Sequence, residues 1–210
     1  MNPYLLAVGA NLSFALGSMF FTHYATRFSS LWMNTFKGTV AACCFCLAIL
    51  ATSGFHQIEI LTFGVFFISG FIALGVGDIF LVKAFTDLGP ARTMVLFGFH
   101  PVIVGFLSFI FFDQAVSTGK LIGILFFITC LIIFSVEKFR ASKKWEFAGI
   151  LIAMAGMSID AVGVVITRYA FNLNENITAF EGNFYRCLGA NVALALIGVF
   201  RPFQFFEKVR

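Results

Sequence analysis

Residues 121–133 read LIGILFFITCLII, a run without a charged residue or a polar face. A helix that is apolar on every side is buried, either in a large protein core or in lipid. A membrane strand would alternate apolar and polar residues over about ten positions, and this run does not. Backbone groups in lipid must find their partners within the segment, which a helix provides. The run therefore predicts a membrane-spanning helix.

Six further stretches of this kind lie on either side of it. A helix needs about 20 mostly apolar residues to cross a hydrocarbon core about 30 Å thick. We therefore predict an all-α polytopic membrane protein with about seven transmembrane helices. The predicted spans cover residues 3–21, 33–52, 60–85, 91–112, 117–136, 147–169 and 183–200.

The composition excludes several other classes of protein. Of the 210 residues, 60% are hydrophobic and only 11% are charged, whereas soluble domains are about a quarter charged. Disorder would require low hydrophobicity, and the odd count of five cysteines does not indicate a secreted disulfide scaffold. The net charge of +4 comes from scattered basic residues, so no nucleic-acid partner is expected. The predicted surroundings are a lipid bilayer, that of the cell (inner) membrane.

The basic residues predict an orientation, because loops rich in Lys and Arg stay on the cytoplasmic side. The strongest basic cluster lies within residues 138–146, which we expect to be a linker loop. With the N-terminus outside, this cluster, Arg27, Arg92 and the basic residues after 200 all face the cytoplasm. The outer loops then hold little beyond Lys120 and Arg168.

Short similarities between distant segments indicate an internal repeat. Residues 13–17 read SFALG and residues 159–163 read IDAVG, and each is followed by a Thr-x-Tyr-Ala motif. The spans that come next open with NTFK at 34–37 and NFYR at 183–186. Because five helices separate the copies, the second copy would be inverted in the membrane, as in many secondary transporters.

The repeat divides the chain into three parts. Residues 1–137 are predicted to form a first five-helix repeat, and residues 138–146 the basic linker. Residues 147–210 are predicted to hold the first two helices of a second, partial repeat.

Motifs in the first repeat carry a resemblance to a known family. GVGDIFLVKAF at 75–85 is followed by LGPAR at 88–92, HPV at 100–102, FDQ at 112–114 and KLIG at 120–123. In this order they resemble the EamA-type transporters of the drug/metabolite transporter superfamily. That resemblance implies two five-helix repeats and transport of small solutes. Family members usually have ten helices, three more than predicted here, and an N-terminus inside, opposite to the charge count.

Asp160 is the first candidate for a transport residue. It lies in the middle of a predicted span, where an ionised carboxylate costs about 2.5–3.5 kcal/mol and usually serves a function. Its place three residues before Gly163 resembles that of the essential carboxylate of the four-helix small multidrug-resistance proteins. A structural ion pair is the alternative. Protonation of Asp160 would couple transport to protons.

Three other charged residues are predicted to lie along the same path. Asp78 follows two small residues, Gly75 and Gly77, that allow close helix approach. It either lines a cavity or pairs with Lys37 or Arg186. These two cations occupy matching repeat positions, where they either bind an anionic group or extend toward the membrane surface.

Asn11 and His100 complete the predicted path. Asn11 lies within the first span and bonds either to another helix or to substrate. His100 precedes Pro101, which should bend the helix and direct the imidazole at a pocket. We expect a midplane cavity lined by the first, third, fourth and sixth helices.

No nucleophile constellation, phosphate loop or metal-ligand spacing is present, so we expect neither an enzyme nor a cofactor nor a metal site. The predicted function is secondary transport of a small metabolite, in the direction of export. A truncated or non-transporting membrane subunit, which assembles with a partner or as a homo-oligomer, is the alternative. A seven-helix receptor fits the span count but not the repeat.

Overall fold

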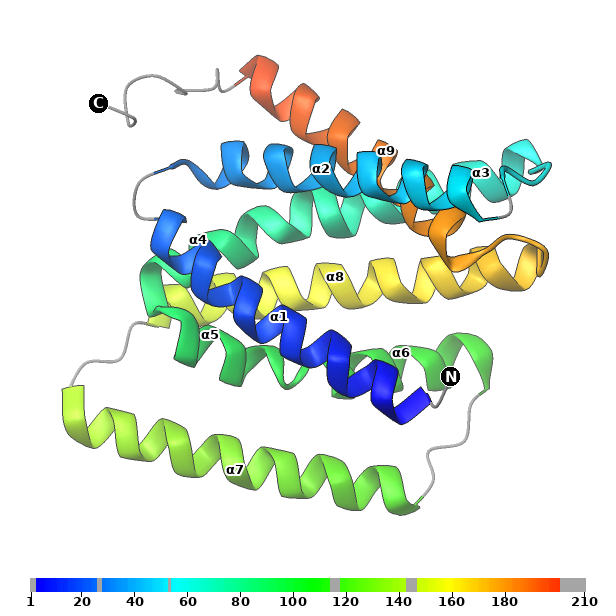
Figure 1. The fold of residues 1–210 in the computed structure, drawn as a ribbon. Helices are drawn as coiled ribbons and strands as arrows, with labels where there is room; N and C mark the ends of the chain where they lie inside the picture. The colour runs from blue at the N-terminus through cyan, green and yellow to red at the C-terminus, as the bar shows by residue number, and fades with distance from the viewer. Residues whose placement is uncertain (1–2, 26–27, 53, 114–117, 143–146, 201–210) are drawn as a thin grey trace.

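The computed structural model describes residues 3–25, 28–52, 54–113, 118–142 and 147–200, and within them it contains helices and no strand (Figure 1). The described chain forms α1 (Pro3–Ala25), α2 (Ser30–Ala51), α3 (Ile60–Gly70), η1 (Phe71–Gly77), α4 (Asp78–Leu88), α5 (Pro90–Phe97), α6 (His100–Phe112), α7 (Thr118–Ser142), α8 (Phe147–Leu173) and α9 (Ala179–Phe200). The basic residues Arg27, Lys143, Lys144, Arg201, Lys208 and Arg210, used for the orientation, lie outside the described residues.

The helices have the lengths that a bilayer requires. Within the described residues, five stretches are long and apolar enough to cross a membrane, and α1 holds a shorter apolar stretch, Val8–Phe21. α7 has 25 residues and therefore extends about 37 Å. The prediction of an all-α polytopic membrane protein is confirmed. The five stretches are Ser30–Ala51, Ile60–Leu88, Arg92–Phe112, Ala148–Leu173 and Ala179–Phe200.

Successive spans run in opposite directions along the bundle, as Figure 1 shows. The amino end of α1 and the connections after α2 and after α8 lie at one end, and the turn at Gly89 lies at the other. α1 runs opposite to α8, and α2 runs opposite to α9, against which it packs. These are the directions that an inverted repeat requires. The repeat itself stays a prediction.

The third span is held between α8 and α9. α8 packs against α3, η1, α4 and α6, whereas α9 packs against α2, α3 and η1. Glycines make this packing close: a Cβ at Gly70 would lie 1.9 Å from the backbone oxygen of Arg186, and one at Gly189 would lie 2.0 Å from that of Phe67. The side chains there must be hydrogen atoms for the backbones to approach so closely. α7 packs against α5 at the periphery (Figure 1).

The third span is not the uninterrupted helix expected over 60–85. Residues Phe71–Gly77 form a π-helix, and Asp78 begins the helix that follows it. A π turn holds extra residues per turn and so changes the direction in which the following side chains face. The hydrophobicity of the sequence could not predict this turn, because an α-helix and a π-helix within a membrane span are equally apolar.

The fourth span is broken as well. α5 ends at Phe97 and α6 begins at His100, with Pro101 in its first turn. The sequence predicts a bend at Pro101, and the break lies just before it, at Gly98 and Phe99. Proline lacks an N–H and crowds the turn before it, so it is not tolerated in the middle of a helix. In the first turn of a helix it is tolerated, and α6 therefore begins just before Pro101.

Several expected boundaries shift. α7 continues to Ser142, so residues 138–142 of the expected linker are helical. α8 continues to Leu173, beyond the expected end at 169, and Arg168, which we had counted with the outer loops, lies on this helix. α9 begins at Ala179, before the expected start at 183.

Candidate functional site

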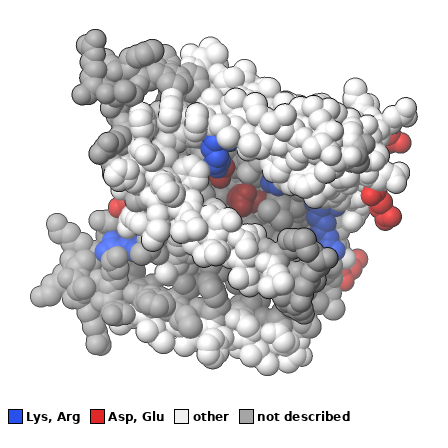
Figure 2. Space-filling model, in the orientation of Figure 1, with Lys and Arg blue, Asp and Glu red and all other residues white. Residues whose placement is uncertain are grey.

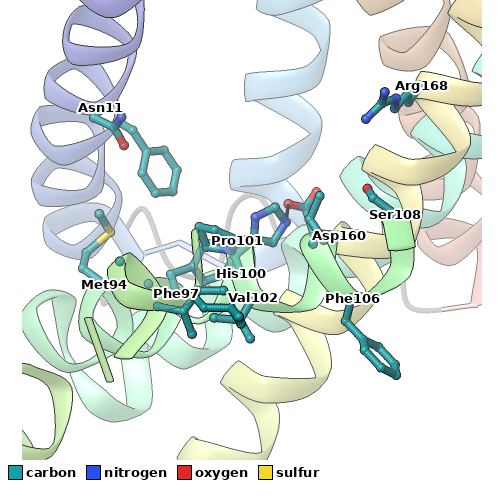
Figure 3. Close-up of a pocket in the computed structure, with 17 residues that line it drawn as sticks. Asn11, Met94, Phe97, His100, Pro101, Val102, Phe106, Ser108, Asp160 and Arg168 are labelled. Carbon is teal, nitrogen blue, oxygen red and sulfur yellow. Dashed lines mark ion pairs between the residues drawn. The ribbon is translucent and has the colours of Figure 1, made fainter. Parts of the chain in front are cut away.

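A cavity of about 1160 Å³ lies between α1, α5, α6, α7 and α8. We call it the α8 pocket, because α8 supplies both of its charged residues, Asp160 and Arg168. Figure 3 shows that the polar ends of Asp160, Arg168 and Ser108 face one space, with Asn11 on α1 across from them. The remaining wall is mostly apolar and aromatic.

Asp160 meets His100 at the restart of the fourth span. His100 Nε2 lies 3.0 Å from Asp160 Oδ2 (Figure 3), and the two side chains are 20% and 21% exposed. The contact has the distance of an ion pair but not the alignment of a hydrogen bond, since Nε2 makes none. The His100 ring also stacks on Phe97, 5.8 Å between centroids. The helix break thus positions a titratable pair in the pocket.

Arg168 is the pocket residue that the sequence analysis missed. It lies eight positions after Asp160 on α8, about 12 Å along the axis, and its guanidinium carbon lies 5.0 Å from the centroid of the Phe112 ring. We had counted Arg168 with the outer loops, whereas it lies on α8. The available signal was the apolar sequence that continues past Arg168 to Leu173.

Asp78 and Lys37 form an ion pair between α2 and α4. Asp78 is only 7% exposed, so its side chain is removed from solvent. The ammonium of Lys37 also lies 5.7 Å from the centroid of the Phe21 ring. Neither residue lines the α8 pocket. We had expected the third helix to line the cavity. The fifth helix, α7, lines it instead, because Asp78 of the third span faces α2.

Arg186, on α9, is close enough to Asp78 and Asp160 for its charge to interact with both. One of its nitrogens donates to Asn183 Oδ1 at 3.3 Å. Its Nε is buried and makes no hydrogen bond. Figure 2 shows acidic and basic side chains gathered in a central hollow, with further charged side chains at the edges of a mostly uncharged face.

The predicted path residues thus fall into two groups. Asn11, His100 and Asp160 line the α8 pocket, whereas Lys37 and Asp78 pair beside it. Charge interactions of Asp160 with Asp78 and Arg186 connect the groups.

The sequence analysis also missed Glu181, which is fully buried at the start of α9. Its carboxylate accepts hydrogen bonds from the backbone N–H of His56 at 2.6 Å and from the backbone N–H and hydroxyl of Thr178 at 2.9 and 2.7 Å. The Thr178 hydroxyl accepts in turn from the N–H of Glu181 at 3.3 Å. This is a capping box that also holds the α2–α3 connection. The Thr-x-x-Glu spacing at 178–181 was its signal.

Within the described ranges, no three His, Cys, Asp or Glu side chains come together as a metal site. Cys43 and Cys44 are exposed, and Cys187 is buried as a free thiol. That the chain holds neither metal nor cofactor stays a prediction.

The fold and the pocket define a polytopic α-helical membrane protein with charged groups inside a cavity between its spans. The model of the EamA-like transporter family matches residues 1–136, and the chain belongs to this family. That assignment confirms the resemblance found in the motifs between residues 75 and 123. A comparison with curated proteins found no match.

Proposed function

We propose that the chain is a secondary transporter that moves a small metabolite across the cytoplasmic membrane by way of the α8 pocket. The direction is export, and the coupling ion is the proton. The observation that carries the proposal is the Asp160–His100 contact, a titratable pair at a helix break that lines a solute-sized cavity between membrane spans. Ionisable groups at such positions mark transport pathways.

Asp160 carries the coupling proton in this proposal. With His100 3.0 Å away, the carboxylate has a cationic partner whenever the imidazole is protonated. A solute that enters the pocket competes with His100 for the same carboxylate, and a proton on Asp160 removes its charge. Solute and proton therefore exclude each other at one site, which is the condition for exchange.

Lys37, Asp78 and Arg186 supply the surrounding charge. The Lys37–Asp78 pair compensates the buried Asp78 carboxylate, and Arg186 interacts by charge with both acidic residues. In the proposal, the Lys37–Asp78 pair holds α2 and α4 together beside the pocket, and Arg186 adjusts the charge that Asp160 experiences.

The transport proposal is tested in cells that lack the gene. Metabolites in the cytoplasm and in the medium are measured in these cells, with and without the wild-type chain supplied in trans. At least one metabolite should accumulate inside the deficient cells and return to the medium on complementation. Unchanged metabolite levels would refute transport, and a rise in the medium of deficient cells would refute export.

The role of Asp160 is tested with Asp160→Asn, which keeps the shape of the side chain but cannot carry the charge. In proteoliposomes loaded with the metabolite so identified, wild-type efflux should rise with an inward proton gradient. Efflux by Asp160→Asn should lose this response. Lys83→Gln is the matched control, because Lys83 is exposed on α4 and outside the pocket. Retention of the gradient response by Asp160→Asn would rule out this coupling residue.

A further inference from the structure

The α8 pocket has an apolar part as well as its polar part. Figure 3 shows Phe106 pointing away from the space that Ser108 and Asp160 share. Helices α6 and α7 both contribute apolar residues to the pocket wall, and we call the space between these residues the α6–α7 cleft. The cleft is lined by Val102, Gly105 and Phe106 of α6 and by Leu121, Gly123 and Ile124 of α7.

Two glycines show that α6 and α7 stand apart. A Cβ added at Gly105 or at Gly123 would meet no atom of another helix within 4 Å. Small residues in membrane helices usually allow close approach, as Gly70 does, where an added Cβ would lie 1.9 Å from an atom of α9. Within the described residues α7 packs against α5, and neither α6 nor α8 packs against α7 to the same extent. The α6–α7 cleft is therefore open space between two helices.

The cleft opens sideways, toward the lipid. Phe106 and Leu121 both line the pocket, yet Phe106 is 63% exposed and Leu121 50% exposed. Because both residues belong to membrane spans, the material outside them is the hydrocarbon layer and not water. The cleft is thus continuous with the bilayer.

The depth of the cleft matches one leaflet. His100 begins α6 and contacts Asp160, the middle residue of α8. From there α6 runs 13 residues to Phe112, about 20 Å, and ends at the end of the bundle where α7 begins (Figure 1). One leaflet of the hydrocarbon core is about 15 Å thick, half of the whole core. The cleft therefore extends from the middle of the membrane toward one surface.

The wall of the cleft favours a hydrocarbon occupant over water. A buried water molecule needs two to four polar partners, and the six side chains that form the cleft are apolar. The backbone groups between them are bonded within their own helices. An unfilled space would cost the wall its dispersion contacts on that side. An extended hydrocarbon chain supplies these contacts.

We infer that one acyl chain of a membrane phospholipid occupies the α6–α7 cleft. The chain enters from the leaflet at the end of the bundle where α6 ends and α7 begins. It lies along α6, and its methyl end points toward the helix break at Gly98 and Phe99. The inference goes beyond the proposed function, because it uses none of the charged residues of the pocket.

The test asks whether lipid or water reaches the cleft. Val102→Trp places a fluorescent reporter there, in a chain whose native tryptophans are removed by Trp32→Phe and Trp145→Phe. The purified full chain is reconstituted in vesicles of phosphatidylcholine, either unmodified or brominated in the middle of the acyl chains. Bromine quenches tryptophan only at close range, and acrylamide in the buffer reports contact with water.

Two further single-tryptophan variants set the scale. Phe126 is 74% exposed on α7, and Phe66 is fully buried in the bundle. The brominated lipid should quench Val102→Trp nearly as strongly as Phe126→Trp and severalfold more than Phe66→Trp. Acrylamide should quench Val102→Trp little. Ile124→Trp is the second reporter if Val102→Trp fails to fold, as judged by helical circular dichroism and gel filtration.

A larger side chain in the cleft should exclude the acyl chain. Gly123→Leu, added to Val102→Trp, should lower the quenching by the brominated lipid, because the leucine occupies the space of the chain. Gly64→Leu is the matched control: a Cβ added at Gly64 also meets no atom within 4 Å, but Gly64 lies outside the pocket. It should leave the quenching unchanged.

Three results would overturn the inference. Quenching of the reporter by acrylamide and not by the brominated lipid would show a cleft filled with water. Quenching by neither would show that α6 and α7 close on each other in the bilayer. Quenching by lipid that Gly123→Leu leaves unchanged would place the chain elsewhere. None of these results decides metabolite export, which the experiment in cells tests separately.

Discussion

At the scale of single residues, the contact between Lys37 and Asp78 shows how the membrane protein accommodates a buried charge. Asp78 is 7% exposed, and an uncompensated charge at such a place is strongly destabilising. The Lys37 side chain is 34% exposed, so the protein encloses the pair only in part. The ion pair thus allows Asp78 to be ionised in a buried position. It does not add net stability to the fold.

Lys37→Met is expected to lower the free energy of unfolding by about 2–3 kcal/mol, less than the loss of a partner in a fully buried pair. The reason is that Asp78 remains buried without its counter-charge. In the double variant Lys37→Met/Asp78→Asn, at least half of this loss should be recovered, because no unpaired charge remains. Denaturant titration in detergent micelles measures both. A double variant less stable than Lys37→Met would contradict the explanation.

At the scale of elements, the third span is positioned by close contacts of its backbone. Gly70, at the end of α3, faces the backbone of α9. A Cβ added at Gly75 would lie 2.5 Å from the Cβ of Ala193. Such contacts leave no room for a larger side chain, because backbone atoms cannot move aside as a flexible side chain does. The π-helix Phe71–Gly77 follows Gly70 directly and contains Gly75, and it packs against both α8 and α9.

Gly70→Ala is expected to destabilise the protein by about 3 kcal/mol, since its Cβ would lie 1.9 Å from the backbone oxygen of Arg186. Gly64→Ala is the matched control: the position belongs to the same helix, and nothing lies within 4 Å of its added Cβ. That substitution should be neutral or stabilise by up to about 1 kcal/mol. Apparent Tm values of the two purified variants test the difference. Equal values would show that α3 and α9 are not packed as described.

At the scale of the whole molecule, the alternating spans fix which connections share a side of the membrane. The N-terminus and the connections after α2 and α8 lie at one end of the bundle (Figure 1). The charge count assigns this end to the outside, because the basic cluster within residues 138–146 belongs to the connection between α7 and α8.

A fluorescent reporter inserted into the segment 138–146 is expected to fluoresce, as such reporters do on the cytoplasmic side. A periplasmic phosphatase reporter at the same place should stay inactive. Fusions in the 52–59 connection provide the matched control and should give the opposite pattern. An active phosphatase in the basic segment would show that the family's usual orientation applies and that the charge rule fails here.

The sequence by itself determined the class of fold, the order of the spans and the family. Each of these depends on local properties: an apolar stretch such as residues 121–133 must be buried wherever it lies, and the motifs between residues 75 and 123 are read in order along the chain. Asp160 and His100 also stood out locally, as polar groups inside apolar spans. The bend before Pro101 was predictable to within a few residues for the same reason.

Only the tertiary structure decided which of these polar groups meet. Lys37 and Asp78 are 41 residues apart in the chain, and hydrophobicity does not record which partner a buried charge will find. Arg168 became a pocket residue because α8 continues past it and packs against α6, where its guanidinium lies over the Phe112 ring. The π-helix at Phe71–Gly77 and the capping box around Glu181 likewise depend on neighbouring helices, whose approach is set by packing and not by the local sequence.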